Sequence, residues 1–134
     1  MGKYIQLENA VFSAFDSTEW KAENIKIYPN NFVAVNPGNE FLKLTVVSGS
    51  PGINLISVSG QLILDIFTPA GNGPRRPTTI ADKLDEYLSG QSITTPNGSV
   101  QFGSSSFSFS GVDSDNASLY KSIYAIPFQF YGVF

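Results

Sequence analysis

A chain of 134 residues fits one domain, because folding at this size buries roughly two thirds of the surface that the unfolded chain exposes. A net charge of -3 with only 8 basic residues argues against sequence-specific nucleic-acid binding, which needs clustered Lys and Arg. His and Cys are absent, which excludes Ser-His-Asp and Cys-His catalytic arrangements and ordinary zinc sites. We therefore expect one domain over 1–134, with no metal and no cofactor. No apolar run approaches the roughly 18 residues of a membrane helix, so no membrane partner is expected.

The first half of the chain predicts one helix followed by three strands. Apolar residues at helical spacing mark a first helix that ends near residue 16, namely Tyr4, Leu7, Val11 and Phe15. A short strand over 25–28 stops at Pro29, and strict alternation predicts strands over 40–47 and 56–67. The second of these should turn Val58, Leu62, Leu64 and Ile66 inward, after a turn built from residues 48–52.

A surface loop and a second helix are expected next. Residues 68–77 hold three prolines and two glycines, which disfavour regular structure. Thr79 and Asp82 have capping-box spacing, and Ile80, Leu84 and Leu88 form the apolar stripe of a helix that Gly90 closes. Asp82, Asp85 and Glu86 fall on its polar side, where a solvated helix face is a better interpretation than a metal or acid-base site.

The last third of the chain predicts three more strands, over 99–102, 106–110 and 119–131. In the final strand one face carries Tyr124, Ile126, Phe128 and Phe130, while Pro127 indicates an edge position or a bulge. The expected fold class is α+β, a mostly antiparallel β-sheet with two α-helices packed on one side. Long strands with few lysines at the edges are weakly protected against strand addition, so the sequence favours assembly over covalent chemistry.

Five segments occur in an order and spacing that resembles the tail-terminator-like proteins of long-tailed bacteriophages, the minor tail protein U group. They are residues 27–32 (IYPNNF), 40–44 (EFLKL), 60–73 (GQLILDIFTPAGNG), 80–84 (IADKL) and 124–128 (YAIPF). The Ser-rich segment 103–111 and the short first helix depart from the family pattern.

The resemblance implies a virion structural protein of the tail and neck, made in the host cytoplasm, without enzyme activity or cofactor. Its partners would be copies of itself in a homohexameric ring, the tail-tube protein, and a head-tail connector or stopper protein. Such a ring caps the tail tube, stops its polymerisation and joins it to the head, with DNA able to pass through.

Two Gly- and Pro-rich segments, 69–77 and 48–55, are the predicted subunit or tube contacts. The candidate residues are Ser50, Asn54, Asn72, Arg75 and Arg76, with the arginines expected to meet carboxylates on a neighbouring subunit. One alternative is a tail-tube or other neck subunit. Another is a carbohydrate-binding β domain that uses exposed aromatics such as Trp20 and Tyr131, and a third is a glycosidase with two carboxylates across a cleft.

Overall fold

The computed structural model describes residues 3–13, 15, 18–22, 25–29, 40–51, 57–71, 73–96, 98–112 and 119–132. The helices are α1 (Lys3–Ser13), the four-residue α2 (Thr18–Lys21) and α3 (Arg75–Leu88). The strands are β1 (Lys26–Pro29), β2 (Phe41–Pro51), β3 (Ser57–Pro69), β4 (Ser92–Thr95), β5 (Gly98–Phe102), β6 (Ser106–Val112) and β7 (Leu119–Gly132). The predicted α+β class is confirmed. None of the described helices has the length and apolar character that a membrane span requires.

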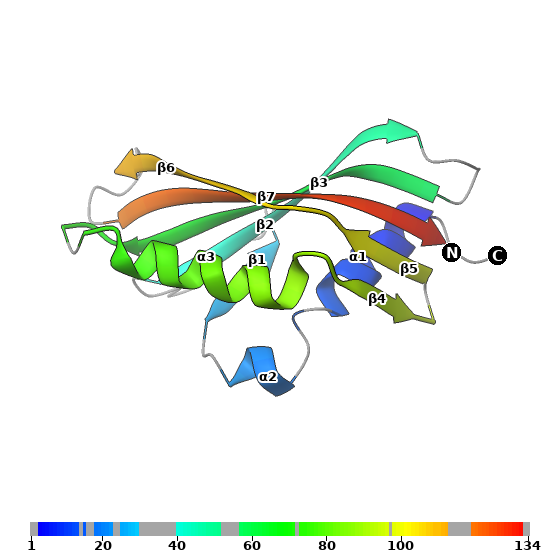
Figure 1. Cartoon of the computed structure of the whole chain (residues 1–134), viewed down its shortest axis with the longest axis horizontal. Coiled ribbons are helices and arrows are strands. Elements are labelled where there is room, and N and C mark those ends of the chain that lie inside the picture. The colour runs from blue at the N-terminus through cyan, green and yellow to red at the C-terminus, as the bar shows by residue number, and fades with distance from the viewer. Residues whose placement is uncertain are drawn as a thin grey trace.

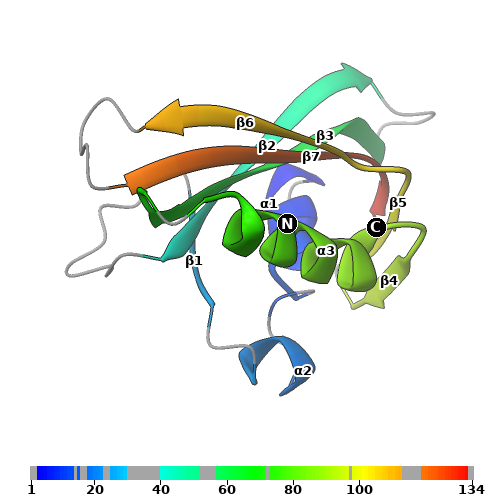
Figure 2. The ribbon, with the colours of Figure 1, turned by 60° about the vertical axis from the view of Figure 1, so that its left-hand side comes forward.

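The strands form one mixed sheet in the order β1-β2-β3-β7-β5-β4, and β6 also pairs with β7 (Figure 1). β1 lies parallel to β2, whereas the other pairings are antiparallel. β7 is the longest strand and has two partners on one side. Its first half pairs with β6 and its second half with β5. Figure 2 shows β6 and β7 side by side above α3.

The hydrophobic core lies on the face of the sheet that we call the inner face. The predicted inward residues of β3 and β7 are confirmed, because Leu62, Leu64, Ile66, Tyr124, Ile126 and Phe130 are at most 1% exposed. They share one hydrophobic cluster with Leu7 and Val11 of α1 and with Leu84 of α3. Alternation along each strand therefore places the core, and both longer helices contribute to it.

One helix face and two short elements differ from the sequence prediction. Tyr4 is 58% exposed, while Gln6 and Ala10 are buried instead, so the stripe of α1 is rotated relative to the predicted one. Neither α2 nor β4 was predicted, because each has only four residues and carries no long apolar pattern.

The predicted turn over 48–52 is wrong for the residues that the structure describes. β2 continues to Pro51, which lies opposite Val58 of β3. The register shifts between Val47 and Ser50, so the Gly/Ser-rich sequence produces a β-bulge inside the strand. Residues 52–56 lie outside the described part of the chain.

The predicted loop over 68–77 is shorter than expected, because β3 extends to Pro69 and α3 begins at Arg75. Pro77 lies in the first turn of α3, where a missing N–H costs nothing. The predicted capping box is also wrong. Thr79 is inside the helix, and its hydroxyl donates a hydrogen bond to the Arg75 carbonyl at 2.7 Å. Gly90 follows the end of α3 with φ +70°, as predicted for a helix terminator.

The sequence predicted an edge position or a bulge at Pro127; it lies in a central strand, so the edge position is wrong. On the side of β7 away from β3, strand pairing is interrupted between β5 and β6, at residues 103–105. The Gly103 N–H donates to the Pro127 carbonyl at 3.0 Å. The carbonyl and the nitrogen of one strand residue point to the same side, so the missing N–H faces this interruption.

Candidate association surfaces

The structure describes three of the five predicted contact residues, and Ser50 lies apart from Arg75 and Arg76. Asn54 and Asn72 lie outside the described residues. Ser50 lies in β2 opposite Ser59, beside the bulge and not in a turn, and its side chain is not described. Arg75 and Arg76 occupy the first turn of α3, where the Arg75 side chain is exposed.

Arg76 binds a carboxylate of its own chain, whereas the sequence had suggested a carboxylate on a neighbouring subunit. Its guanidinium Nε donates to Glu40 Oε2 at 2.8 Å, and Nη2 donates to Oε1 at 2.6 Å. This bidentate pair joins the start of α3 to the residue that precedes β2. Arg75 is the more exposed of the two, so it is the better candidate for a contact with another molecule.

An apolar groove of about 610 Å³ lies next to this helix start. One wall comes from the β3–α3 connection and the other from the end of the β6–β7 pair, namely Pro69, Gly71, Gly73, Pro74, Phe109, Val112 and Tyr120. Phe109 is 47% exposed and Val112 is 58% exposed. Large apolar side chains that line a groove at this exposure are typical of a protein contact surface.

The β6 strand forms a free edge among the residues that the structure describes, because it pairs only with β7. Its sequence, SFSFSGV, contains no charged residue and no proline. Native edges usually carry lysine, proline or inward-pointing charges that prevent pairing with another chain. Here the single protective feature is the register shift between Phe109 and Gly111. The edge is therefore open over its first four residues.

The groove and the open edge were only partly predicted. Phe107 and Phe109 lie two residues apart in the predicted strand over 106–110, and both lie on the inner side of β6. Phe107 packs against the core, whereas Phe109 extends beyond it. The sequence signal was the charge-free alternation of Ser and Phe, but that pattern does not reveal where the core ends.

A charged cluster lies on the opposite, outer face of the sheet. Lys43 is directly opposite Asp65, and the ammonium of Lys121 lies 3.9 Å from an Asp65 carboxylate oxygen. Burial raises the pKa of Asp65 from its ordinary value, and the two lysines only partly oppose that shift. The folded chain therefore binds the Asp65 proton more readily than the unfolded chain does.

Asp65→Asn is expected to remove one pH dependence of stability. As the pH rises above the ordinary Asp value of 3.8, the unfolded chain releases this proton while the folded chain retains it. The free energy of unfolding of the wild type should therefore fall with rising pH until the folded-state pKa is passed, and then level off. The difference between the two proteins in urea denaturation from acidic to neutral pH measures the effect. A constant difference across that range would contradict it.

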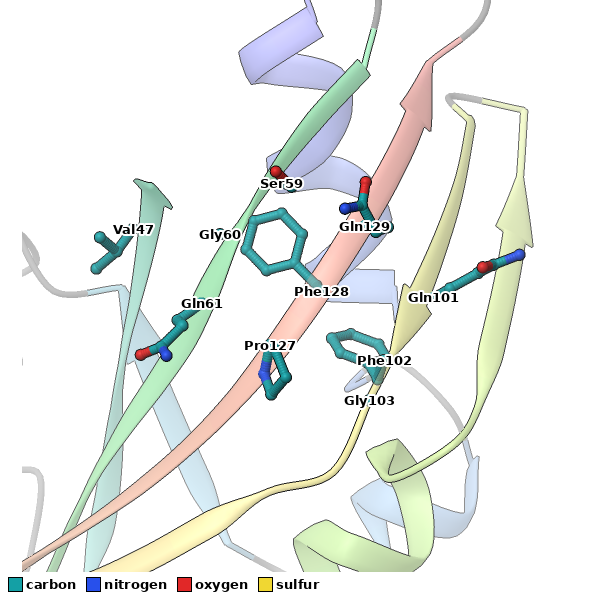
Figure 3. Close-up of a pocket in the computed structure, with 10 residues that line it drawn as sticks. All are labelled: Val47, Ser59, Gly60, Gln61, Gln101, Phe102, Gly103, Pro127, Phe128 and Gln129. Carbon is teal, nitrogen blue, oxygen red and sulfur yellow. The ribbon is translucent and has the colours of Figure 1, made fainter. Parts of the chain in front are cut away.

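A depression of about 620 Å³ lies on the outer face near the junction of β3, β5 and β7. It is lined by uncharged side chains that include Val47, Gln61, Gln101, Pro127 and Gln129 (Figure 3). The amide groups of Gln61 and Gln101 point away from each other in that view. This divergence is the opposite of what a small-molecule site needs, where a few polar groups converge.

The sequence predicted one solvated face for the acidic residues of α3, but the structure places them in two environments. Asp82 and Glu86 are exposed, but Asp85 is directed towards the sheet. Its Oδ1 accepts hydrogen bonds from the Ser105 hydroxyl at 2.5 Å and the Tyr124 hydroxyl at 2.6 Å. Burial, and then the bond to Asp85, raise the pKa of Tyr124. Asp85 thus ties α3 to the junction between β5 and β6.

The geometry weakens the glycosidase and the carbohydrate-binding alternatives. Asp65 lies on the outer face and Asp85 on the inner side, so these two half-buried carboxylates do not face one cleft. Within the described residues, no group of three or more acidic residues is placed to hold a metal ion. Trp20 is only 2% exposed and packs edge-on between Phe15 and Tyr87, which removes it as a sugar-stacking surface.

Comparison with known proteins adds a fold and no function. No protein-family model matches this chain, and no curated protein matches it in sequence. A solved structure whose name states no function superposes with a TM-score of 0.63, covering 97% of this chain and 96% of its own. At 12% identity, this similarity establishes a shared fold alone.

Proposed function

We propose that this protein is a virion structural subunit, a phage tail terminator whose copies form a ring that caps the tail tube. Its scaffold is a mostly antiparallel sheet with α1 and α3 against one face. The observation that carries the proposal is the apolar groove beside the β3–α3 connection, with Phe109 and Val112 exposed in it. The family resemblance of the sequence supports the same reading.

The groove supports a contact between neighbouring subunits for two physical reasons. Burying exposed apolar side chains releases about 25 cal/mol per Å² of covered apolar surface. Among the groove residues there is no charged side chain, so closure there desolvates no charge. Arg75 directly follows Pro74 of the groove wall and can meet a carboxylate at the rim, which would favour one orientation of the neighbour.

The decisive experiment combines this protein with the tail-tube protein of the same phage. Electron microscopy should show one ring at one end of each tube, and tubes that stop growing when the protein is present. Decoration along the whole tube would instead favour the runner-up, a tail-tube subunit. Failure to bind tubes in any form would overturn the proposal.

Arg75→Glu is expected to weaken ring formation at tube ends at least tenfold while leaving stability within about 0.5 kcal/mol of wild type, because Arg75 is exposed. Lys26→Glu serves as the control, because it makes the same charge change at an exposed residue of β1. Arg76→Ala should instead cost about 1 kcal/mol of stability through loss of the partly exposed Glu40 pair. Urea denaturation and ring counting separate the effects. Normal rings with Arg75→Glu would exclude Arg75 from the contact.

A further inference from the structure

We propose that the free protein forms a symmetric dimer in which β6 pairs antiparallel with β6 of a second copy, centred on Ser108. The starting observation is the open β6 edge, which has no partner other than β7 among the described residues. The occupant that fits it best is a second copy of the same strand. The dimer does not depend on the ring proposed above.

The other described edges are less suited to pair with β6. β1 has four residues and carries Lys26 and Pro29, both of which oppose strand addition. β4 also has only four residues. β1 also leaves residues 45–51 of β2 without a second strand, but that stretch ends in Pro51 and contains the register shift between Val47 and Ser50. β6 is longer than β1 and β4, and segment 103–112 contains no charge. Two copies of a chain with net charge -3 therefore meet without like-charge repulsion at this contact.

Backbone directions identify which β6 groups are free. The Gly103 N–H donates to the Pro127 carbonyl, so the backbone polar groups of Pro127 point away from β3. These directions alternate from residue to residue along a strand, so the backbone N–H and C=O groups of residues 125 and 123 point towards β6. Their partners, Ser106 and Ser108, are thus hydrogen-bonded to β7. Phe107 and Phe109 consequently present their N–H and C=O groups at the open edge.

Two copies of β6 can pair antiparallel in several registers. Only one of these registers places Phe107 and Phe109 of one copy opposite Phe109 and Phe107 of the other. In it, Phe107 of one copy lies opposite Phe109 of the other, and the symmetry axis passes Ser108. Each Phe107–Phe109 pair exchanges both backbone hydrogen bonds, and aromatic cross-strand pairs add stability. The irregularity between Phe109 and Gly111 ends the ladder, which limits pairing to this short segment.

The chain has no cysteine, so a single introduced thiol gives a clean test of the register. In the dimer, the two Ser108 Cα atoms form a non-hydrogen-bonded pair about 4.5 Å apart, which is within disulfide range. Ser108→Cys should therefore form a disulfide-linked dimer under mild oxidation. Ser106→Cys is the matched control, because its two copies would lie more than about 10 Å apart. Equal cross-linking of both variants, or none, would overturn the proposed register.

Sedimentation equilibrium of the full-length protein tests the dimer without any modification. Wild type should dimerise at micromolar concentration, and Phe109→Lys should raise the dimer dissociation constant at least tenfold by placing a charge in the ladder. Val47→Lys, which adds the same charge at a residue of similar exposure on β2, should leave the constant unchanged. A monomeric wild type would overturn the dimer, as would equal effects of the two lysines.

The dimer also bears on assembly where the proposed ring holds. Phe109 belongs to both the β6 ladder and the apolar groove, so the dimer covers part of the groove. A symmetric pair cannot continue into a ring with two different faces, because its two members are related by a two-fold axis. The dimer would then keep free subunits from closing rings until a tube end displaces the contact. If the free protein proves to be monomeric, ring formation at tube ends can still be observed. Failure of the dimer proposal and failure of the ring proposal are therefore distinguishable.

Discussion

Gly98→Ala is expected to lower the free energy of unfolding by about 2–5 kcal/mol. Gly98 has φ +138°, a conformation that side chains rarely adopt. A Cβ there would lie 2.5 Å from the Tyr131 carbonyl oxygen and 2.8 Å from the Phe130 ring. Phe130 is fully buried, so its ring has no free space to move into.

Gly71→Ala provides the matched control for backbone strain. Gly71 also has positive φ, at +87°, but nothing lies within 4 Å of an added Cβ. Its substitution should cost only about 1–2 kcal/mol, the ordinary penalty of that backbone region. Urea denaturation of both variants measures the difference. Equal losses would show that the close approach of Gly98 to β7 is not what constrains this position.

Asp85→Ala should destabilise the protein by about 2–4 kcal/mol, because two hydroxyl groups lose a charged acceptor. The Tyr124 side chain is 1% exposed, so its hydroxyl cannot regain a bond to bulk water. Asp82→Ala, on the exposed face of the same helix, should change stability by no more than about 0.5 kcal/mol.

A double-mutant cycle with Tyr124→Phe separates the hydrogen bond from other effects at Asp85. In the Phe background, Asp85→Ala should cost at least about 1 kcal/mol less, because no tyrosine hydroxyl remains to be left unpaired. The cycle is measured by urea denaturation of the four proteins. Strict additivity, or an Asp85→Ala cost as small as that of Asp82→Ala, would contradict the coupling.

Loss of Asp85 also bears on the association surface. Ser105, its second donor, lies in the junction that leads from β5 into β6. The same carboxylate therefore fixes α3, the buried ring of Tyr124 and the start of the open edge. We expect changes at this junction to disturb the β6 contact, since β6 pairs with no described strand other than β7.

The candidate surface could be predicted only in outline. Weak edge protection followed from the scarcity of lysine, and it is confirmed for β6. The role of Arg76 could not be predicted, because Glu40 lies 36 residues away in sequence and local pattern carries no information on that distance. The helix boundary was also misjudged at Pro77, since proline is compatible with both a loop and a first helical turn.

Which strand residues face the core could be predicted from the amino-acid sequence, as at Leu62, Leu64 and Tyr124. This was possible because the alternation of side chains is a property of each strand's own backbone. Only the tertiary structure decided that β7 lies between β3 and β5, that Asp85 meets Tyr124, and that Phe109 is exposed while Phe107 is covered. Each of these depends on which distant segment lies alongside, and that is set by packing of the whole chain.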